Sequence, residues 1–262
     1  NDRYFFTAGQ HRVDKDFHPA LGFIQRNDMV GTGAIMGFTP RVGNGEELIR
    51  QLRFTLYVRD VKNLEGLSET SIINGGIDAI FESRDRIGLK IIQEKEKLSN
   101  GFTLGNGLEI LKGEHIDRKI SFSARTNQSR GVWGNFAISK GDYFGGNKTS
   151  WNSSIGKQFS NHLTLYGSAN QNIIFMPNQG EFTANIYGFT AEVALNRKWF
   201  GKAIIQYDNF SDQLQLYCRI NWIHTPGSDL FIVINKLYNM SGKNHALLQN
   251  TQVVKLTYLF QI

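Results

Sequence analysis

Histidines are the residues of this chain best suited to metal binding or acid–base catalysis. The six lie at positions 11, 18, 115, 162, 224 and 245. No two have the HxH, HxxxH or HExxH spacing that places two imidazoles on one metal ion. We therefore expect no metal site and no cofactor.

A serine–histidine pair is the second arrangement that could do chemistry, as in a hydrolase. His162 and Ser168 are six residues apart and share a face of an extended strand. That spacing separates them by about 20 Å, which is too far for a hydrogen bond. The chain also lacks the GxSxG sequence of a nucleophile elbow. We expect no catalytic residues and no enzymatic activity.

Cysteine and glycine have structural rather than chemical explanations. The single cysteine, Cys218, excludes an intrachain disulfide and is expected to be a small apolar strand residue. The segments Gly31-Thr32-Gly33 and Gly105-Asn106-Gly107 lack the strand–helix context of a phosphate loop. We expect their glycines to ease curvature or close packing within strands.

The sequence predicts that these residues lie on strands, because apolar and polar residues alternate along the chain. In residues 51–59, Leu52, Phe54, Leu56 and Val58 share one face while polar side chains and Tyr57 share the other. Segments of this kind, each about 10 residues long, recur about 14 to 16 times. Residues 94–98 have a helix-favouring composition but continue the strand that begins at Arg86.

The alternation predicts a membrane-spanning sheet. No stretch approaches ~20 consecutive apolar residues, so no transmembrane helix is expected. The mean hydropathy of −0.32 is compatible with spanning strands, because lipid-facing and interior residues alternate. The last residues also alternate, with Val254, Leu256, Tyr258, Phe260 and Ile262 on one face, which is similar to the C-terminal signal of outer-membrane barrels.

The sequence thus predicts an all-β fold, an antiparallel transmembrane β-barrel of about 14–16 strands in a single domain over residues 1–262. We expect it to be closed, because a membrane tolerates no free strand edge. The expected location is the bacterial outer membrane, with its lipid and lipopolysaccharide as partners. Thr225-Pro226-Gly227-Ser228 predicts a type II periplasmic turn, and Met240 to Thr251 an outer loop. Longer connections are also expected at Tyr143 to Lys148 and Met176 to Phe182.

Two sets of residues follow from this fold. The expected lumen charges are Arg53, Arg59, Lys90, Lys119, Arg125, Glu192, Lys202, Arg219 and Lys255, with Asp78, Glu82 and Asp208 as further acids. The expected interfacial aromatic girdle comprises Trp199, Tyr207, Trp222, Tyr258 and Phe260. A basic lumen would favour anions; an internal salt-bridge network is the alternative interpretation, which we favour. The net charge of +6 is spread along the chain, so no nucleic-acid partner is expected.

Several segments resemble one protein family. Asn221 to Val233, Lys255 to Phe260, Asp16 to Arg26, Gly141 to Gly146 and Ile173 to Phe182 are similar to the C-terminal barrel of an uncharacterised family frequent in Bacteroidota. In that family the barrel often follows a carbohydrate-binding domain of the family-9 type, which this chain lacks. The resemblance implies an outer-membrane location, a link to glycans, and a longer precursor with further strands before Asn1. It implies no catalytic residues.

Three functional hypotheses remain. The first is a porin-like barrel that anchors a binding or assembly function or passes solutes, with a glycan or other outer-membrane proteins as partners. The second is an outer-membrane hydrolase active at the barrel rim. The third is a soluble β-sandwich or lectin.

Overall fold

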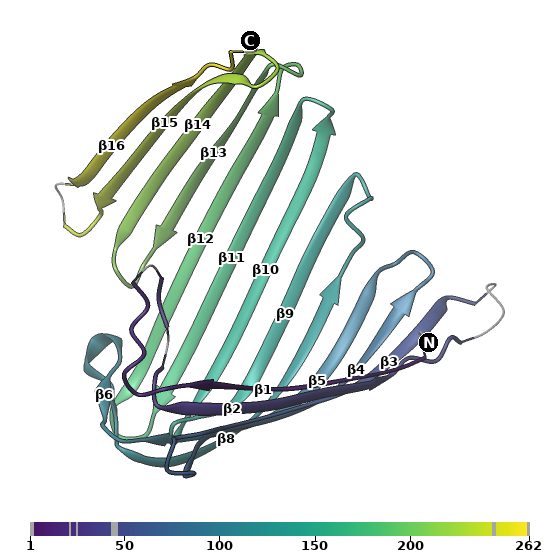
Figure 1. The fold of residues 1–262 in the computed structure, drawn as a ribbon, viewed down its shortest axis with the longest axis vertical. Coiled ribbons are helices and arrows are strands. Elements are labelled where there is room, and N and C mark those ends of the chain that lie inside the picture. Colours follow the sequence, from purple (N-terminus) through teal and green to yellow (C-terminus); the bar gives the residue numbers. More distant parts are fainter. Residues whose placement is uncertain (1–2, 21, 25, 43–46, 243–244, 261–262) are drawn as a thin grey trace. The chain divides into compact units, whose positions relative to one another are not determined.

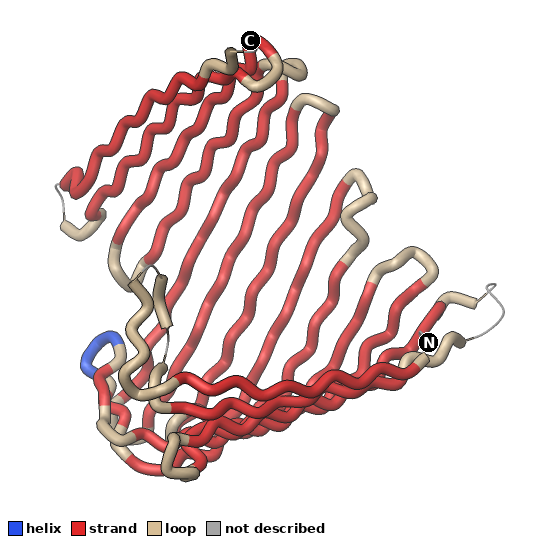
Figure 2. Tube along the Cα trace, in the orientation of Figure 1, coloured by secondary structure: helices blue, strands red, loops and turns tan. Residues whose placement is uncertain are grey.

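The computed structural model describes residues 3–20, 22–24, 26–42, 47–242 and 245–260. Strands make up most of this part of the chain, and its one helical segment is the 3-10 turn η1 (Gly105–Gly107), drawn blue in Figure 2. One antiparallel sheet holds 14 strands, which follow one another in chain order across the sheet. The predicted all-β class is confirmed, and the strand number lies within the expected range. No helix in the described part is long and apolar enough to cross a membrane.

The strands are 10 to 15 residues long in the main sheet. Their bounds are β1 (Tyr4–Val13), β2 (Met29–Phe38), β3 (Ile49–Lys62), β4 (Ser68–Phe81), β5 (Arg86–Leu98), β8 (Gly113–Arg125), β9 (Val132–Tyr143), β10 (Gly146–Ser160), β11 (Leu163–Met176), β12 (Gly180–Ala194), β13 (Trp199–Asp208), β14 (Gln213–Thr225), β15 (Ser228–Asn239) and β16 (Ala246–Thr257). A separate two-stranded sheet pairs β6 (Phe102–Thr103) with β7 (Glu109–Ile110). As predicted, residues 94–98 continue the strand from Arg86.

The chain divides into two compact units. Unit 1 comprises Asn1–Arg125, Ala137–Ser150 and Ile173–Phe182. Unit 2 comprises Thr126–Phe136, Trp151–Asn172 and Thr183–Ile262. Within unit 1, β1 to β5 lie side by side, and within unit 2 β13 to β16 do the same (Figure 1).

An apolar face runs across the strands of unit 1. Residues opposite each other on paired antiparallel strands project from the same side of a sheet. The register therefore places large apolar residues in rows, and the longest row is Tyr4, Phe38, Phe54, Ile77, Leu89 and Phe122. Each of these side chains is exposed, by 37% to 59%. Tyr4 and Phe38 stack with ring centroids 5.0 Å apart.

Unit 2 has an apolar face of the same kind. One row carries Val193, Ile220, Ile232 and Val254, with Gly201 between the first two. The next row carries Trp199, Trp222, Leu230 and Leu256. Cys218 lies on the same face, opposite Ala203 and Ile234, and is a half-buried free thiol. The small apolar role expected for this cysteine agrees with its position.

Few apolar side chains are buried. In the described part these are Val61, Leu108, Ile110, Ile174, Met176 and Phe182. Leu108 and Ile110 belong to the 14-residue connection between β5 and β8, which contains the small β6–β7 sheet. Gln179, in the turn after β11, fixes this connection by accepting from the Glu109 N–H at 2.6 Å and donating to its carbonyl at 3.1 Å. The main sheet is therefore apolar on its surface rather than around a core.

The turns agree only in part with the sequence analysis. Gly227 has φ of +80° between β14 and β15, as the type II turn requires. Tyr143 to Lys148 and Met176 to Phe182 are not long loops: two residues join β9 to β10, and three join β11 to β12. Strand pairing continues into these polar segments, because ladder hydrogen bonds do not need apolar side chains. For the same reason β16 already begins at Ala246, so the expected loop from Met240 to Thr251 is shorter than predicted.

The C-terminal segment leaves the sheet earlier than the alternation suggests. β16 ends at Thr257, and Tyr258 to Phe260 follow without strand pairing. The Leu259 N–H donates instead to the hydroxyl of Ser228 at 2.8 Å. Ile262, which was expected on the apolar face, lies outside the described residues.

Candidate functional site

The charged residues expected in the lumen share one face of the sheet within each unit. In unit 1, the strand register places five cations on the side of the sheet away from the apolar rows: Arg53, Arg59, Lys90, Lys119 and Arg125. In unit 2, Glu192, Lys202 and Arg219 form one cross-strand row, and Lys255 lies in the next row. We call this side the polar face of each unit. Alternation along each strand is enough to separate these charges from the apolar rows.

Ion pairs account for few of these cations. In unit 1, the Lys119 ammonium contacts the Glu94 carboxylate. In unit 2, the Lys202 ammonium lies 2.9 Å from the Glu192 carboxylate. In the part of the chain that the structure describes, the other six expected lumen cations form no ion pair. The salt-bridge interpretation that the sequence favoured thus explains two of eight cations.

Asp78 shows why a facing acid does not become an ion pair. It lies directly opposite Arg53 on the neighbouring strand, and it is 9% exposed. Its carboxylate leans instead over Gly88, where an added Cβ would lie 2.3 Å from Oδ1. Arg53 Nε is left buried without a hydrogen-bond partner. This arrangement keeps the Arg53 guanidinium available to another acceptor.

The other expected acids have local roles. Asp208, at the end of β13, accepts from the Phe210 N–H at 2.8 Å and from the Ser211 hydroxyl at 3.0 Å. Glu82 lies exposed in the turn between β4 and β5. These two acids are therefore turn residues at the strand ends, away from the middle of the polar face.

The polar face of unit 2 forms a depression of about 540 Å³. Arg219, Asn221 and Phe200 contribute to its lining, together with the Glu192–Lys202 pair. The Arg219 guanidinium donates to the Asn221 side chain at 2.7 Å and lies 5.0 Å from the Phe231 ring centroid. The Lys255 ammonium lies 5.7 Å from the same ring. The partners of these two cations are thus an amide side chain and an aromatic ring, and not carboxylates.

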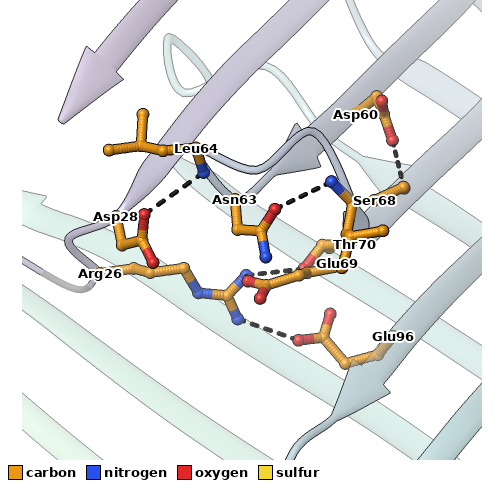
Figure 3. A network of polar contacts seen from close by, with 10 residues as sticks. Arg26, Asp28, Asp60, Asn63, Leu64, Ser68, Glu69, Thr70 and Glu96 are labelled. Carbon is orange, nitrogen blue, oxygen red and sulfur yellow. Dashed lines mark hydrogen bonds and ion pairs between the residues drawn. The ribbon is translucent and has the colours of Figure 1, made fainter. Parts of the chain in front are cut away.

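A cluster around Arg26 was not predicted from the sequence. Arg26, in the connection between β1 and β2, binds the Glu69 carboxylate at 3.3 Å and the Glu96 carboxylate at 3.2 Å (Figure 3). Its guanidinium also donates to the Thr70 hydroxyl at 3.2 Å. The Asp28 carboxylate accepts a hydrogen bond from the Leu64 N–H at 3.3 Å, and Figure 3 shows this bond beside Arg26. These contacts fix the connection to the ends of β4 and β5.

The expected girdle residues lie on the apolar side at two ends of unit 2. Trp199 stacks on Trp222 at 5.3 Å, and Tyr258 contacts Phe260 at 4.6 Å. His224 links the pairs, with centroids 5.6 Å from Trp222 and 5.5 Å from Tyr258. His224 was not predicted from the sequence, although its position two residues after Trp222 was a usable signal.

Tyr207 does not belong to this stack. It shares the face of Trp199 but lies at the opposite end of β13, opposite Tyr187 and Leu214. Its hydroxyl donates to the Asp212 carboxylate at 2.9 Å. Trp199 and Trp222 thus lie at one end of the apolar rows of unit 2, and Tyr207 lies at the other end.

The structure does not bring His162 and Ser168 together as a catalytic pair. The His162 ring Nδ1 is 2.6 Å from the Ala194 carbonyl oxygen. The Ser168 hydroxyl lies over Gly188, within 2.7 Å of an added Cβ. In the described part, no group of three or more His, Cys, Asp or Glu residues is placed to hold a metal ion. Comparison with known protein families and with curated proteins gave no match.

Proposed function

We propose that this chain is a bacterial outer-membrane β-barrel, closed by pairing of β1 with β16. In this proposal the apolar face contacts lipid, and the polar face encloses a water-filled interior that binds or passes polar solutes. The function is non-enzymatic. The lipid and lipopolysaccharide of the outer membrane are its partners.

The observation that carries the proposal is the row of exposed apolar side chains across the strands of unit 1. Tyr4, Phe54 and Leu89 are 59%, 39% and 42% exposed. Contiguous apolar surface of this extent is unfavourable in water and favourable against hydrocarbon. Strands in hydrocarbon must also have every backbone group paired, which a closed ring achieves. Both requirements favour a barrel in a membrane over a soluble sheet.

The aromatic residues at the two ends of β13 support the same proposal. Trp199 and Tyr207 are eight residues apart on one face. At about 3.4 Å per residue this separation is about 27 Å along the strand. A strand tilt of about 40° reduces it to about 20 Å across a bilayer, close to the ~25 Å band of outer-membrane barrels. Aromatic side chains are favoured at both membrane interfaces.

The orientation follows from the usual direction of the last strand, which runs towards the periplasm. The turn at Pro226 and Gly227 would then be periplasmic, and the connection between β15 and β16 would be outside. The family resemblance and its link to glycans remain predictions from the sequence. No contact described above favours a rim hydrolase, and the scarcity of buried apolar side chains gives little support to a soluble β-sandwich.

The test is folding in detergent and in lipid. The denatured chain is diluted into detergent micelles or lipid vesicles and analysed by gel electrophoresis with and without boiling. We expect an unboiled band that migrates differently from the boiled one, and strands protected from added protease in vesicles. A monomer that folds in buffer without detergent or lipid would contradict the proposal.

A further inference from the structure

The polar face of unit 1 places two arginines directly opposite each other. Arg86 on β5 pairs in register with Arg125 on β8. Like charges at facing positions of paired strands destabilise a sheet. Neither guanidinium forms an ion pair in the described part of the chain. The pair therefore lacks the counter-charge that such an arrangement requires.

Two further cations lie in the next rows of the same face. Arg53 is in the row of Gly88, two residues from Arg86, and Lys90 is in the row beyond. Such rows are about 6.7 Å apart and neighbouring strands about 4.8 Å apart, so these long side chains can reach a common point. An added Cβ at Gly76 would lie 3.2 Å from Lys90 Cγ, which shows that the lysine stem crosses this glycine.

In the described part of the chain, no acid forms an ion pair with these four cations. Asp78 leans over Gly88, and its neighbour there is the hydroxyl of Ser123, 3.0 Å from the same added Cβ. Asp85, in the turn before β5, accepts from the Ser83 hydroxyl at 2.8 Å. Arg53 Nε is buried without an acceptor. One unused donor and four unpaired cations thus face the same region.

We infer that Arg53, Arg86, Lys90 and Arg125 form a binding site for an oxyanion of the phosphate or carboxylate class. The planar guanidinium groups match the two oxygens of such an anion, and an oxyanion between Arg86 and Arg125 removes their repulsion. Arg53 Nε gains the acceptor that it lacks. The inference rests on the proposed function only in that the polar face is open to water.

The test uses inorganic phosphate and the full chain folded in detergent. Thermal unfolding is followed in sodium phosphate and in sodium chloride of equal ionic strength. Because phosphate binds the folded state, we expect the unfolding midpoint of the unaltered protein to rise with phosphate concentration. The double variant Arg86→Gln/Arg125→Gln should show no such rise, and at low ionic strength without phosphate it should be at least as stable as the unaltered protein.

Two single variants complete the test. Lys90→Gln keeps the arginine pair and should need a several-fold higher phosphate concentration for the same midpoint shift. Lys140→Gln makes the same charge change at an exposed position of β9 and should keep the full response. An unaltered protein that responds equally to phosphate and chloride, or a double variant that still responds, would overturn the site. Failure to fold in detergent would instead overturn the proposed barrel.

Discussion

At the scale of single residues, glycines decide how closely two strands approach. An added Cβ at Gly141 would lie 2.1 Å from the Arg118 carbonyl oxygen and 2.5 Å from the Lys119 Cα. Both atoms belong to the backbone of β8, so no side chain can move aside. Gly75, on β4, has no atom within 4 Å of the same position. Two glycines that look alike in the sequence therefore carry different constraints.

We expect Gly141→Ala to lower the free energy of unfolding by about 1–3 kcal/mol, because β8 and β9 must separate to admit the methyl group. Gly75→Ala is the matched control, and we expect it to be neutral or to stabilise by up to about 1 kcal/mol through reduced chain entropy. Urea unfolding of both variants in lipid vesicles measures the difference. Equal effects of the two substitutions would contradict the close approach at Gly141.

The glycines also show what the sequence could predict at this scale. Gly31 was expected to permit close packing, and an added Cβ there would lie 2.3 Å from the His11 ring. Gly105 to Gly107 was expected to do the same within a strand, and this was wrong. That segment is a 3-10 turn, and Gly107 has φ of +81°. A glycine's neighbours depend on strand register, which is not written in its local sequence.

At the scale of one element, β3 presents two surfaces with different chemistry. Leu56 projects from the apolar face and is 38% exposed, whereas Tyr57 projects from the polar face, opposite Asn74. If the apolar face contacts hydrocarbon, a charge is costly at Leu56 and tolerated at Tyr57.

We therefore expect Leu56→Lys to destabilise the protein in lipid vesicles by about 2–4 kcal/mol. Tyr57→Lys, one residue away on the opposite face, should cost less than about half of that, since its ammonium stays in water. Chemical unfolding in vesicles gives both values. In a soluble sheet, Tyr57→Lys would lower the free energy of unfolding as much as Leu56→Lys or more. An equal or greater loss in Tyr57→Lys would therefore contradict lipid contact of the apolar face.

Strands were predictable from the sequence, and the ends of strands were less so. Alternation from Leu52 to Val58 predicted β3, and Pro226-Gly227 predicted the turn between β14 and β15. The pattern missed that β9 extends to Tyr143 and that β16 begins at Ala246, because a hydrogen-bonded ladder places no demand on side-chain polarity. Sequence patterns report where one face is apolar and the other polar, and they lose information where both faces are polar.

The candidate site was predictable only as a list of residues on one face. Alternation placed Arg53, Lys90 and Arg125 on one face, and the register puts them on one side of the sheet; that this side lines a lumen stays a prediction. It did not reveal that Arg86 faces Arg125, because that contact depends on the length and path of the connection between β5 and β8. The Arg26 cluster joins residues 43, 44 and 70 positions apart, and no local pattern marks such distant partners.

At the scale of the whole molecule, the proposed barrel requires that the backbone N–H and C=O groups at the outer edges of the two outermost strands find hydrogen-bond partners. β1 and β16 are the first and last strands in the order of the sheet. An unpaired strand edge is unfavourable in hydrocarbon, because its N–H and C=O groups have no partner. Closure of β1 on β16 in antiparallel pairing would remove both edges, and an even number of strands permits it.

Disulfide cross-linking between β1 and β16 tests whether the sheet closes. In a Cys218→Ser background, Thr7→Cys is combined in turn with cysteine at positions 249, 251, 253 and 255, on the same face of β16. Gln252→Cys and Val254→Cys, on the other face, are the controls. We predict that one or two of the same-face pairs form a disulfide in vesicles, seen as a shift in the denatured, non-reduced band, and that the controls do not. Absence of any cross-link across the four pairs would contradict the closed barrel.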